Sequence, residues 1–318
     1  MTPGRSVERS ADAKGSGVPA LGIVVWVVFV AAGSALERVT LIDSILVFAP
    51  LVIVPLARPL TPAVRPLPSW VELGAATAVA IAFLLDAGVL AALLASTWLA
   101  TALVALLATA AAQLRARAPD VASLVALVAS VYLVVAASFV LATRARWSIA
   151  GISEPIIELT GVHFHYAGFA TVVIAGAAVR ASIKARPLAV AALAGVAVAA
   201  PFVAAGFTWT IEVFQVGGAV LLTVSLWTLA AVTIFAAAPR TPRAAYFLLV
   251  ISSLSVPAPM VLAVFWAVSQ YTYVPALSIP DMARVHGTLN AFGFVTCGLV
   301  GWRLAASSQP ASQPAGAT

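Results

Sequence analysis

The sequence predicts an all-α fold, a polytopic bundle of transmembrane helices, and three observations lead to this prediction. Hydrophobic residues make up 63% of the 318 residues and charged residues only 9%, and the mean hydropathy is +1.08. The apolar runs are rich in Ala, Leu and Val and do not alternate with a period of two, which excludes a transmembrane barrel. Backbone groups in hydrocarbon must bond to one another, so helices are the structure that remains.

About ten apolar runs are long enough to cross a bilayer, which needs roughly 20 residues each. Proline-containing breaks separate most of the runs, because proline cannot continue a helix through its interior. The bundle is expected over residues 19–305, between two polar, disordered cytoplasmic tails at 1–18 and 306–318. The ten predicted spans are 19–36, 39–57, 69–85, 88–112, 121–143, 155–179, 188–208, 211–237, 244–269 and 284–305.

The basic residues fall mainly on one side of this topology. With the N-terminus inside, 13 of the 17 Lys and Arg residues are cytoplasmic and only Arg38, Arg144, Arg146 and Arg284 are external. This asymmetry follows the positive-inside rule for a bacterial inner membrane protein. It predicts an even number of spans with both termini cytoplasmic, and it fits eight spans as well as ten. The charge serves topology, so the expected partner is the lipid bilayer and not nucleic acid.

Most acids and all three histidines gather toward the opposite, outer side. Arg38 is placed where it could neutralise Asp43, one turn inside the second span. Ionisable groups at membrane depth usually face a bundle interior or a water-filled cavity. Their convergence from several spans on one leaflet therefore predicts a shared polar site that opens outward.

The sixth span carries the densest polar set. At about 100° per residue, His163 and His165 point about 160° apart, so they cannot chelate one ion together and must serve different neighbours. Tyr166 follows them directly. One stripe within about 60° is polar or small, which favours close approach of a neighbouring helix. Its members are Glu154, Glu158, Gly161, His165 and Gly168.

Two further spans contribute candidate residues to the same site. His286 and Asn290 lie one turn apart on one face of the last span, followed on the same stripe by Gly293 and Cys297. Glu212 lies near the outer boundary of the eighth span, on the same face as a glutamine one turn further in. The lone cysteine excludes an intramolecular disulfide and a cysteine-based metal cluster.

The motifs Leu159–Phe169 (LTGVHFHYAGF) and His286–Phe294 (HGTLNAFGF) resemble the YndJ-like family of bacterial integral membrane proteins. About 20 residues in two helices carry the resemblance, and the remainder matches only as multispan sequence. Members are labelled as uncharacterised proteins or candidate transporters, so the resemblance implies a polytopic membrane protein and, through these labels, transport. The four residues His163-Phe164-His165-Tyr166 are also similar to a motif of haem-copper oxidases. That reading is rejected, because an oxidase site needs several further histidines and only His286 is left.

Three functions use the same outer cluster. The favoured one is a transporter of a small solute or ion, with Glu158, His163, His165, Tyr166, Glu212, His286 and Asn290 binding substrate or protons. Pro201 and the pair Pro257 and Pro259 are its candidate kinks, because transporters use broken helices. The second is a metal- or haem-binding protein with His163, His165 and His286 as ligands. The third is a membrane-embedded hydrolase with Glu158 or Glu212 as base and His286 as acid. No nucleophile motif supports an enzyme, and no catalytic residue is assigned.

Overall fold

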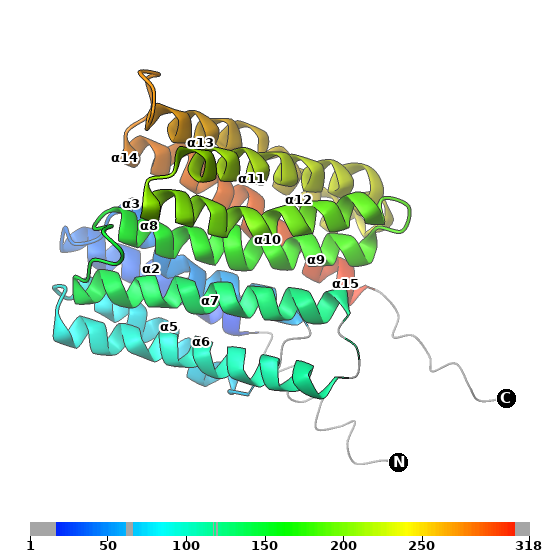
Figure 1. Ribbon diagram of the computed structural model, residues 1–318. Helices are drawn as coiled ribbons and strands as arrows, with labels where there is room; N and C mark the ends of the chain where they lie inside the picture. Colours follow the sequence, from blue (N-terminus) through cyan, green and yellow to red (C-terminus); the bar gives the residue numbers. More distant parts are fainter. Residues whose placement is uncertain (1–16, 62–65, 117, 119, 309–318) are drawn as a thin grey trace, which may run out of the picture.

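The fold is a bundle of long helices that run roughly parallel and antiparallel to one another (Figure 1). The computed structural model describes residues 17–61, 66–116, 118 and 120–308, and within these ranges there is no β-strand. The tails expected at 1–18 and 306–318 lie almost wholly outside the described residues. At the two edges, helix α2 begins at Val18 and the last helix continues to Ser307.

Ten segments, numbered here along the chain, make up the described bundle. Nine are long and apolar enough to cross a membrane, and the remaining one, the third segment α5, is an apolar helix of 16 residues. At 1.5 Å per residue α5 is about 24 Å long, shorter than a hydrocarbon core of about 30 Å. The segments are α2 (Val18–Ala35), Leu41–Leu60, α5 (Ser69–Leu84), α6 (Val89–Arg115), α7 (Val121–Ala145), Ile156–Ala181, α10 (Arg186–Trp209), Glu212–Arg240, Arg243–Ser269 and Ile279–Ser307.

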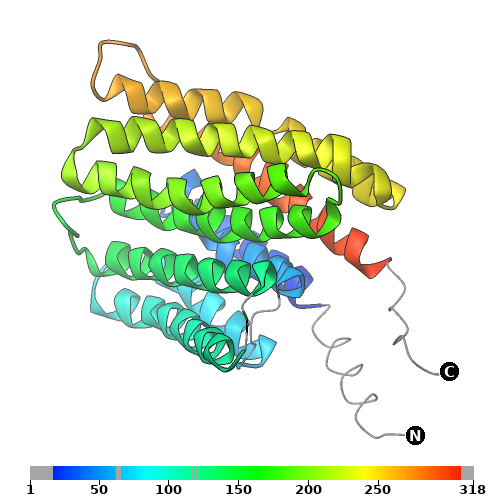
Figure 2. The ribbon, with the colours of Figure 1, turned by 45° about the vertical axis from the view of Figure 1, so that its right-hand side comes forward.

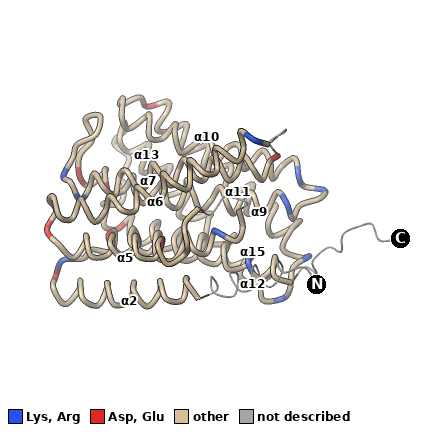
Figure 3. Tube along the Cα trace, turned by 90° about the horizontal axis from the view of Figure 1, so that it is seen from below, with Lys and Arg blue, Asp and Glu red and all other residues tan. Residues whose placement is uncertain are grey.

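Charged residues divide between the two ends of the bundle. Figure 3 shows most Lys and Arg residues at the end where the described chain starts and finishes, and most Asp and Glu residues at the other end. The ends of the described chain share one side because ten segments cross the bundle in alternating directions. This is the arrangement that the positive-inside rule requires of an even-span protein. We call the basic end the inner end and the acidic end the outer end.

The second and sixth segments form the centre of the bundle. Of their most apolar 18-residue windows, 72% and 83% of residues are buried, against 22% for both α2 and α10 at the periphery. Neighbouring helices approach closely through small residues, as is usual between helices in membranes. A Cβ on Gly22 of α2 would collide with the carbonyl oxygen of Leu51 in the second segment. Figure 2 shows the same core from a second direction, with the other helices arranged around it.

Several segments depart from regular α-helix. The ninth segment is broken into α12 (Arg243–Leu254) and α13 (Pro257–Ser269), at the proline pair expected to kink it, whereas α10 continues through Pro201. The second, sixth, eighth and tenth segments contain π-helical stretches, which are rare in proteins and frequent at functional sites. The sixth segment has η3 (Phe164–Ala170), and the tenth has η6 (Ala283–Gly287) and η7 (Leu289–Thr296).

Polar side chains fix the beginnings of several helices. The second segment starts at a capping box, in which Asp43 accepts the backbone N–H of Thr40 at 2.7 Å and returns its own N–H to the Thr40 hydroxyl. Arg38 does not pair with Asp43 as expected. Its guanidinium contacts Asp86, in the connection between α5 and α6, at 3.1 Å, and Asp43 is turned toward its own cap.

At the inner end, Asp120 caps α7. Its carboxylate accepts the backbone N–H of Ser123 at 2.7 Å, and hydrogen bonds from Ser123 lower the pKa of the Asp120 carboxyl. The folded protein therefore stabilises the ionised carboxylate of Asp120.

Candidate functional site

The sixth segment directs its two histidines to opposite sides of the helix. It consists of α8 (Ile156–His163), the π-helical stretch η3 and α9 (Thr171–Ala181). His163 ends α8 and has an exposed side chain although it lies at the centre of the bundle, so its ring borders an internal space. His165 is fully buried. The angular prediction that the pair serves two different neighbours agrees with this geometry.

Both ring nitrogens of His165 are engaged within the protein. Its Nδ1 lies 2.8 Å from the carbonyl oxygen of Gly161, which can only accept, so Nδ1 carries the proton and donates. Its Nε2 accepts the indole N–H of Trp98 on α6 at 3.2 Å. This arrangement holds the sixth segment against α6. Neither nitrogen is left to bind a ligand.

His163 and His286 face each other across the sixth and tenth segments. Their ring centroids are 6.3 Å apart, with the ring planes inclined by 37°. The Nδ1 of His163 donates to the carbonyl oxygen of Leu159 at 2.6 Å, and that of His286 donates to Pro259 at 2.7 Å. The Pro259 carbonyl lies at the start of α13, directly after the break in the ninth segment. The break and the histidine pair are therefore joined by one hydrogen bond.

Asn290 completes this group from the same face as His286. Its side-chain amide donates from Nδ2 to Nε2 of His286 over 3.3 Å, while its Oδ1 is buried without a hydrogen-bond partner. The predicted pairing of the two residues one turn apart is thus present. Tyr166 lies nearby and donates its hydroxyl to the carbonyl oxygen of Ile45, which ties the sixth segment to the second.

A cavity of about 260 Å³ lies beside the histidine pair. Its volume is close to the lower end of the range for small-molecule sites, ~300–1,000 Å³. The walls are mainly aliphatic and aromatic, and no Asp, Glu, Lys or Arg is among the described residues that form them. The polar side chains in the wall belong to Thr160, His163, Tyr166, Thr171, Thr208, Gln215, Trp266, His286 and Asn290.

Most of these hydroxyl groups already have partners. The hydroxyls of Thr160, Thr171 and Thr208 each donate to a backbone carbonyl of their own segment. Among the described residues of the wall, the polar atoms without a hydrogen-bond partner are Nε2 of His163, Oδ1 of Asn290, Nε2 of Gln215 and the indole N–H of Trp266.

Gln215 belongs to the cavity although Glu212 was the residue assigned to the site from this segment. It lies in α11 (Glu212–Val232), is 3% exposed and accepts the hydroxyl of Tyr271 on Oε1 at 2.7 Å. Its Nε2 is buried without a hydrogen-bond partner. The signal in the sequence was an amide one turn inside the membrane, on the same face as a more conspicuous acid.

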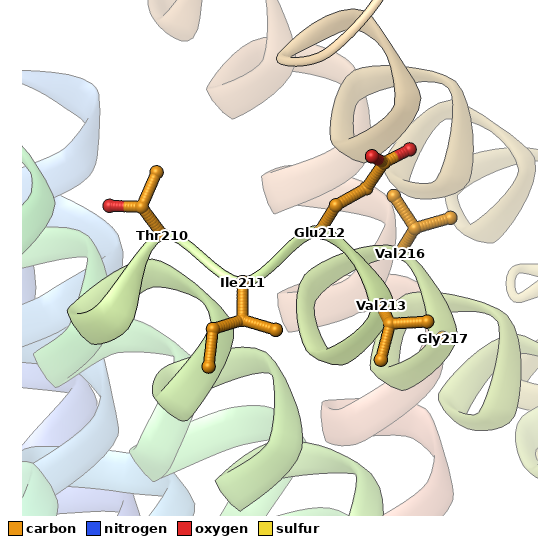
Figure 4. Close-up of a pocket in the computed structure, with 6 residues that line it drawn as sticks. All are labelled: Thr210, Ile211, Glu212, Val213, Val216 and Gly217. Atoms are coloured by element: carbon orange, nitrogen blue, oxygen red, sulfur yellow. The ribbon is translucent and has the colours of Figure 1, made fainter.

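Glu212 itself is exposed at the connection between α10 and α11. It borders a shallow surface pocket with Thr210, Ile211, Val213, Val216 and Gly217. Figure 4 shows these side chains spread over the turn and the first turns of α11, with the Glu212 carboxylate extending away from the turn. The residue is absent from the wall of the histidine cavity.

Glu158 lies near the outer end and outside the cavity wall. Its carboxylate is close enough to interact with Asp43, Glu154 and the guanidinium of Arg144 on α7. Its backbone N–H donates to Glu154 at 3.2 Å. The single Glu–His stripe expected on the sixth segment is therefore divided between an outer charged cluster and the His165 anchor. The hydrolase hypothesis requires a carboxylate beside His286. Neither Glu158 nor Glu212 lines the cavity that His286 borders.

The three histidines do not converge on one point. Over the described part of the chain, no group of three or more His, Cys, Asp or Glu side chains is placed to hold a metal ion. His163 and His286 come together, while His165 is committed to Trp98 and Gly161. Of the three histidines expected as ligands of a metal or haem, only His163 and His286 lie together.

These features define an α-helical, multi-pass membrane protein with an uncharged internal cavity. The chain belongs to the family of YndJ-like proteins, whose family model matches residues 39–294. This range contains both sequence motifs in full, and the membership agrees with a location in a bacterial inner membrane.

A curated relative is the "Uncharacterized membrane protein YndJ" of Bacillus subtilis (strain 168). It is 31% identical over 166 residues, which are 51% of this chain and 29% of that protein. The chain thus matches less than a third of the length of this relative. No solved structure matches the chain.

Proposed function

We propose that the protein is a transporter that carries a small solute through the cavity beside His163 and His286. The observation that carries this proposal is the position of the cavity. Residues of seven membrane segments form its wall, and it contains polar groups that a lipid-facing surface would not have. A buried polar site between helices at membrane depth is typical of substrate pathways.

The cavity lies in the outer half of the bundle. Its wall includes Ile152 and Ile279 near the outer ends of segments, and it extends inward to Thr171 and Phe294. Below it the inner half is closely packed, with Ile53 and Leu299 fully buried. This asymmetry corresponds to a solute site on the outer side of a thick inner barrier, one of the two states that an alternating-access transporter requires.

The irregular segments supply places where the bundle could bend. The tenth segment is π-helical at His286 and Asn290, and the ninth is broken beside Pro259. Discontinuous helices at the substrate site are a recurring feature of transporters, because interrupted backbone allows one part of a segment to move against the other. The histidine pair lies where the sixth, ninth and tenth segments meet.

Cysteine accessibility tests this proposal without knowledge of the solute. The protein has one cysteine, Cys297, whose thiol donates to a backbone carbonyl, so Cys297→Ser provides a conservative background. Single cysteines are placed at Ala204 and Ala263 on different walls of the cavity. The control position is Ala175, which is fully buried and outside the cavity wall.

A membrane-impermeant thiol reagent is then applied to right-side-out and inside-out vesicles. For a transporter, we expect Ala204→Cys and Ala263→Cys to react in both preparations, because the site opens to each side in turn, while Ala175→Cys stays unreactive. Reaction in one preparation only, or in neither, would exclude alternating access at this cavity. Extensive labelling of the control would show that the bundle is not folded in the vesicles.

A further inference from the structure

The chemistry of the ligand can be inferred from the hydrogen bonds of His163. The carbonyl oxygen of Leu159 can only accept a hydrogen bond, so the proton on the ring of His163 is on Nδ1. In a neutral ring this leaves Nε2 as an acceptor. Within the described residues Nε2 of His163 has no hydrogen-bond partner, and the ring borders the cavity.

The opposing histidine has the same tautomer but a different role. The carbonyl of Pro259 places the proton of His286 on Nδ1, and its Nε2 is occupied by the amide of Asn290. His286 therefore positions Asn290, which keeps Oδ1 as an unpartnered acceptor near the same end of the cavity. The histidine end thus offers acceptors. The buried Nε2 of Gln215 is a donor elsewhere in the wall.

The walls also select against charge. Among the described residues of the lining there is no carboxylate to match a cation and no Lys or Arg to match an anion. Burying an ion without a partner is far more costly than burying a neutral group that forms hydrogen bonds. Phe164, Phe207, Trp266 and Phe294 supply aromatic surface for an apolar body.

We infer that the cavity binds a small, uncharged molecule with an apolar body and at least one O–H or N–H group, whose proton is accepted by Nε2 of His163. The inference rests on the proposed function in taking this cavity as the solute site. It narrows the solute from any small molecule or ion to neutral amphipathic compounds.

A matched set of probes tests the inference on the purified full-length chain in detergent. The probes are 4-ethylphenol, its methyl ether 4-ethylanisole, which has the same body without the donor, and the anion 4-ethylbenzoate. Binding is measured as the rise in apparent melting temperature with probe concentration, since a ligand that binds the folded state stabilises it by mass action. We expect 4-ethylphenol to bind about fivefold more tightly than the ether, the usual effect of one hydrogen bond, and the anion not to bind.

Two kinds of variant separate cavity binding from partition into the micelle. Ala263→Trp places a large side chain in the cavity and should abolish the phenol effect, whereas Val261→Trp adds the same group on the exposed face of α13 and should leave it unchanged. His163→Phe keeps an aromatic ring but removes the acceptor, and should make the phenol and its ether bind equally. If Ala263→Trp fails to fold, His163→Phe alone decides.

Several results would overturn the inference. They are equal binding of phenol and ether to the native chain, preferential binding of the anion, or a phenol preference that survives His163→Phe. The two experiments test the two proposals separately. Cysteine labelling from both sides of the vesicles without a preference for the phenol would support transport and contradict the inferred ligand class. Preferential phenol binding together with cysteine labelling from one side only would support the inferred ligand class and contradict transport.

Discussion

At the scale of single residues, two histidines that are two positions apart have different roles because of their hydrogen-bond partners. A backbone carbonyl one turn earlier fixes the tautomer of both rings. Trp98 then occupies the remaining nitrogen of His165, whereas the same nitrogen of His163 borders the cavity. His165 is therefore an internal anchor of the sixth segment, and His163 is available to a ligand.

Replacement of Trp98 by Phe tests the anchor. The change removes the indole N–H and leaves Nε2 of the fully buried His165 without a donor, which typically costs about 1–3 kcal/mol. We expect a clear fall in apparent melting temperature in detergent. Trp227→Phe is the matched control, because Trp227 is 43% exposed on the surface of α11 and its loss should shift stability by less than about 0.5 kcal/mol. Equal shifts for the two variants would contradict the anchoring role.

At the scale of elements, the hairpin of α10 and α11 places Gln215 in the cavity. The two helices are in close contact where Gly206 of α10 faces the backbone of Gln215. A Cβ on Gly206 would lie 2.6 Å from the Cα of Gln215, closer than any normal contact. The missing side chain of one glycine therefore determines how deeply the amide of Gln215 enters the bundle.

Gly206→Ala is expected to separate α10 from α11 and to destabilise the protein by roughly 1–3 kcal/mol, the usual cost of forcing extra atoms into a packed interface. The control in the same hairpin is Gly217→Ala, since a Cβ at Gly217 would meet no atom within 4 Å. That variant should be neutral or slightly more stable, because alanine favours helix over glycine. Thermal unfolding of both variants provides the comparison, and loss of stability in Gly217→Ala alone would refute the packing argument.

At the scale of the whole molecule, the topology follows from the distribution of charge. The ends of the described chain lie at the basic end of the bundle (Figure 3). Cytoplasmic connections carry an excess of Lys and Arg because basic residues near the ends of spans resist translocation. The short acidic outer connections, together with Arg38, Arg144, Arg146 and Arg284, are thereby placed outside.

Reporter fusions test this orientation. Alkaline phosphatase, which is active only outside the cytoplasm, should be inactive when fused after Ser308 and active when fused after Tyr273, in the connection between the ninth and tenth segments. A fluorescent protein that folds only in the cytoplasm should give the opposite pattern at the same two positions. Activity of the phosphatase after Ser308 would show that the chain is inverted or that the number of spans is odd.

The sequence predicted the segments well because hydropathy and proline breaks are local properties. Ten runs were expected, and the described part of the chain has ten helical segments with ends within about five residues of those expected. The short helix α5 is the one that falls below the length of a full span. The π-helical stretches at His286 and Phe164 were not predicted, because a π-turn arises from packing against neighbouring helices and leaves no period in the sequence.

The arrangement of the candidate residues was predicted in part, and their role as a site stays a prediction. Helical geometry correctly separated His163 from His165 and paired His286 with Asn290. It could not tell which of the two histidines faces His286, because that depends on how the sixth segment is rotated within the bundle. Glu212 was assigned to the site in place of Gln215, because an ionisable group at membrane depth is costly and usually marks a functional site.

The sequence by itself determined that the chain is a helical membrane protein, roughly where its segments lie, and which end is basic. These properties depend on transfer of local runs of side chains from water to lipid, which needs no knowledge of neighbours. Only the tertiary structure decided that His163 and His286 border the same cavity and that Trp98 donates a hydrogen bond to His165. It also decided that Glu158 and Glu212 do not line this cavity. Those facts depend on helix rotation and close packing, which are set by contacts between segments far apart in the chain.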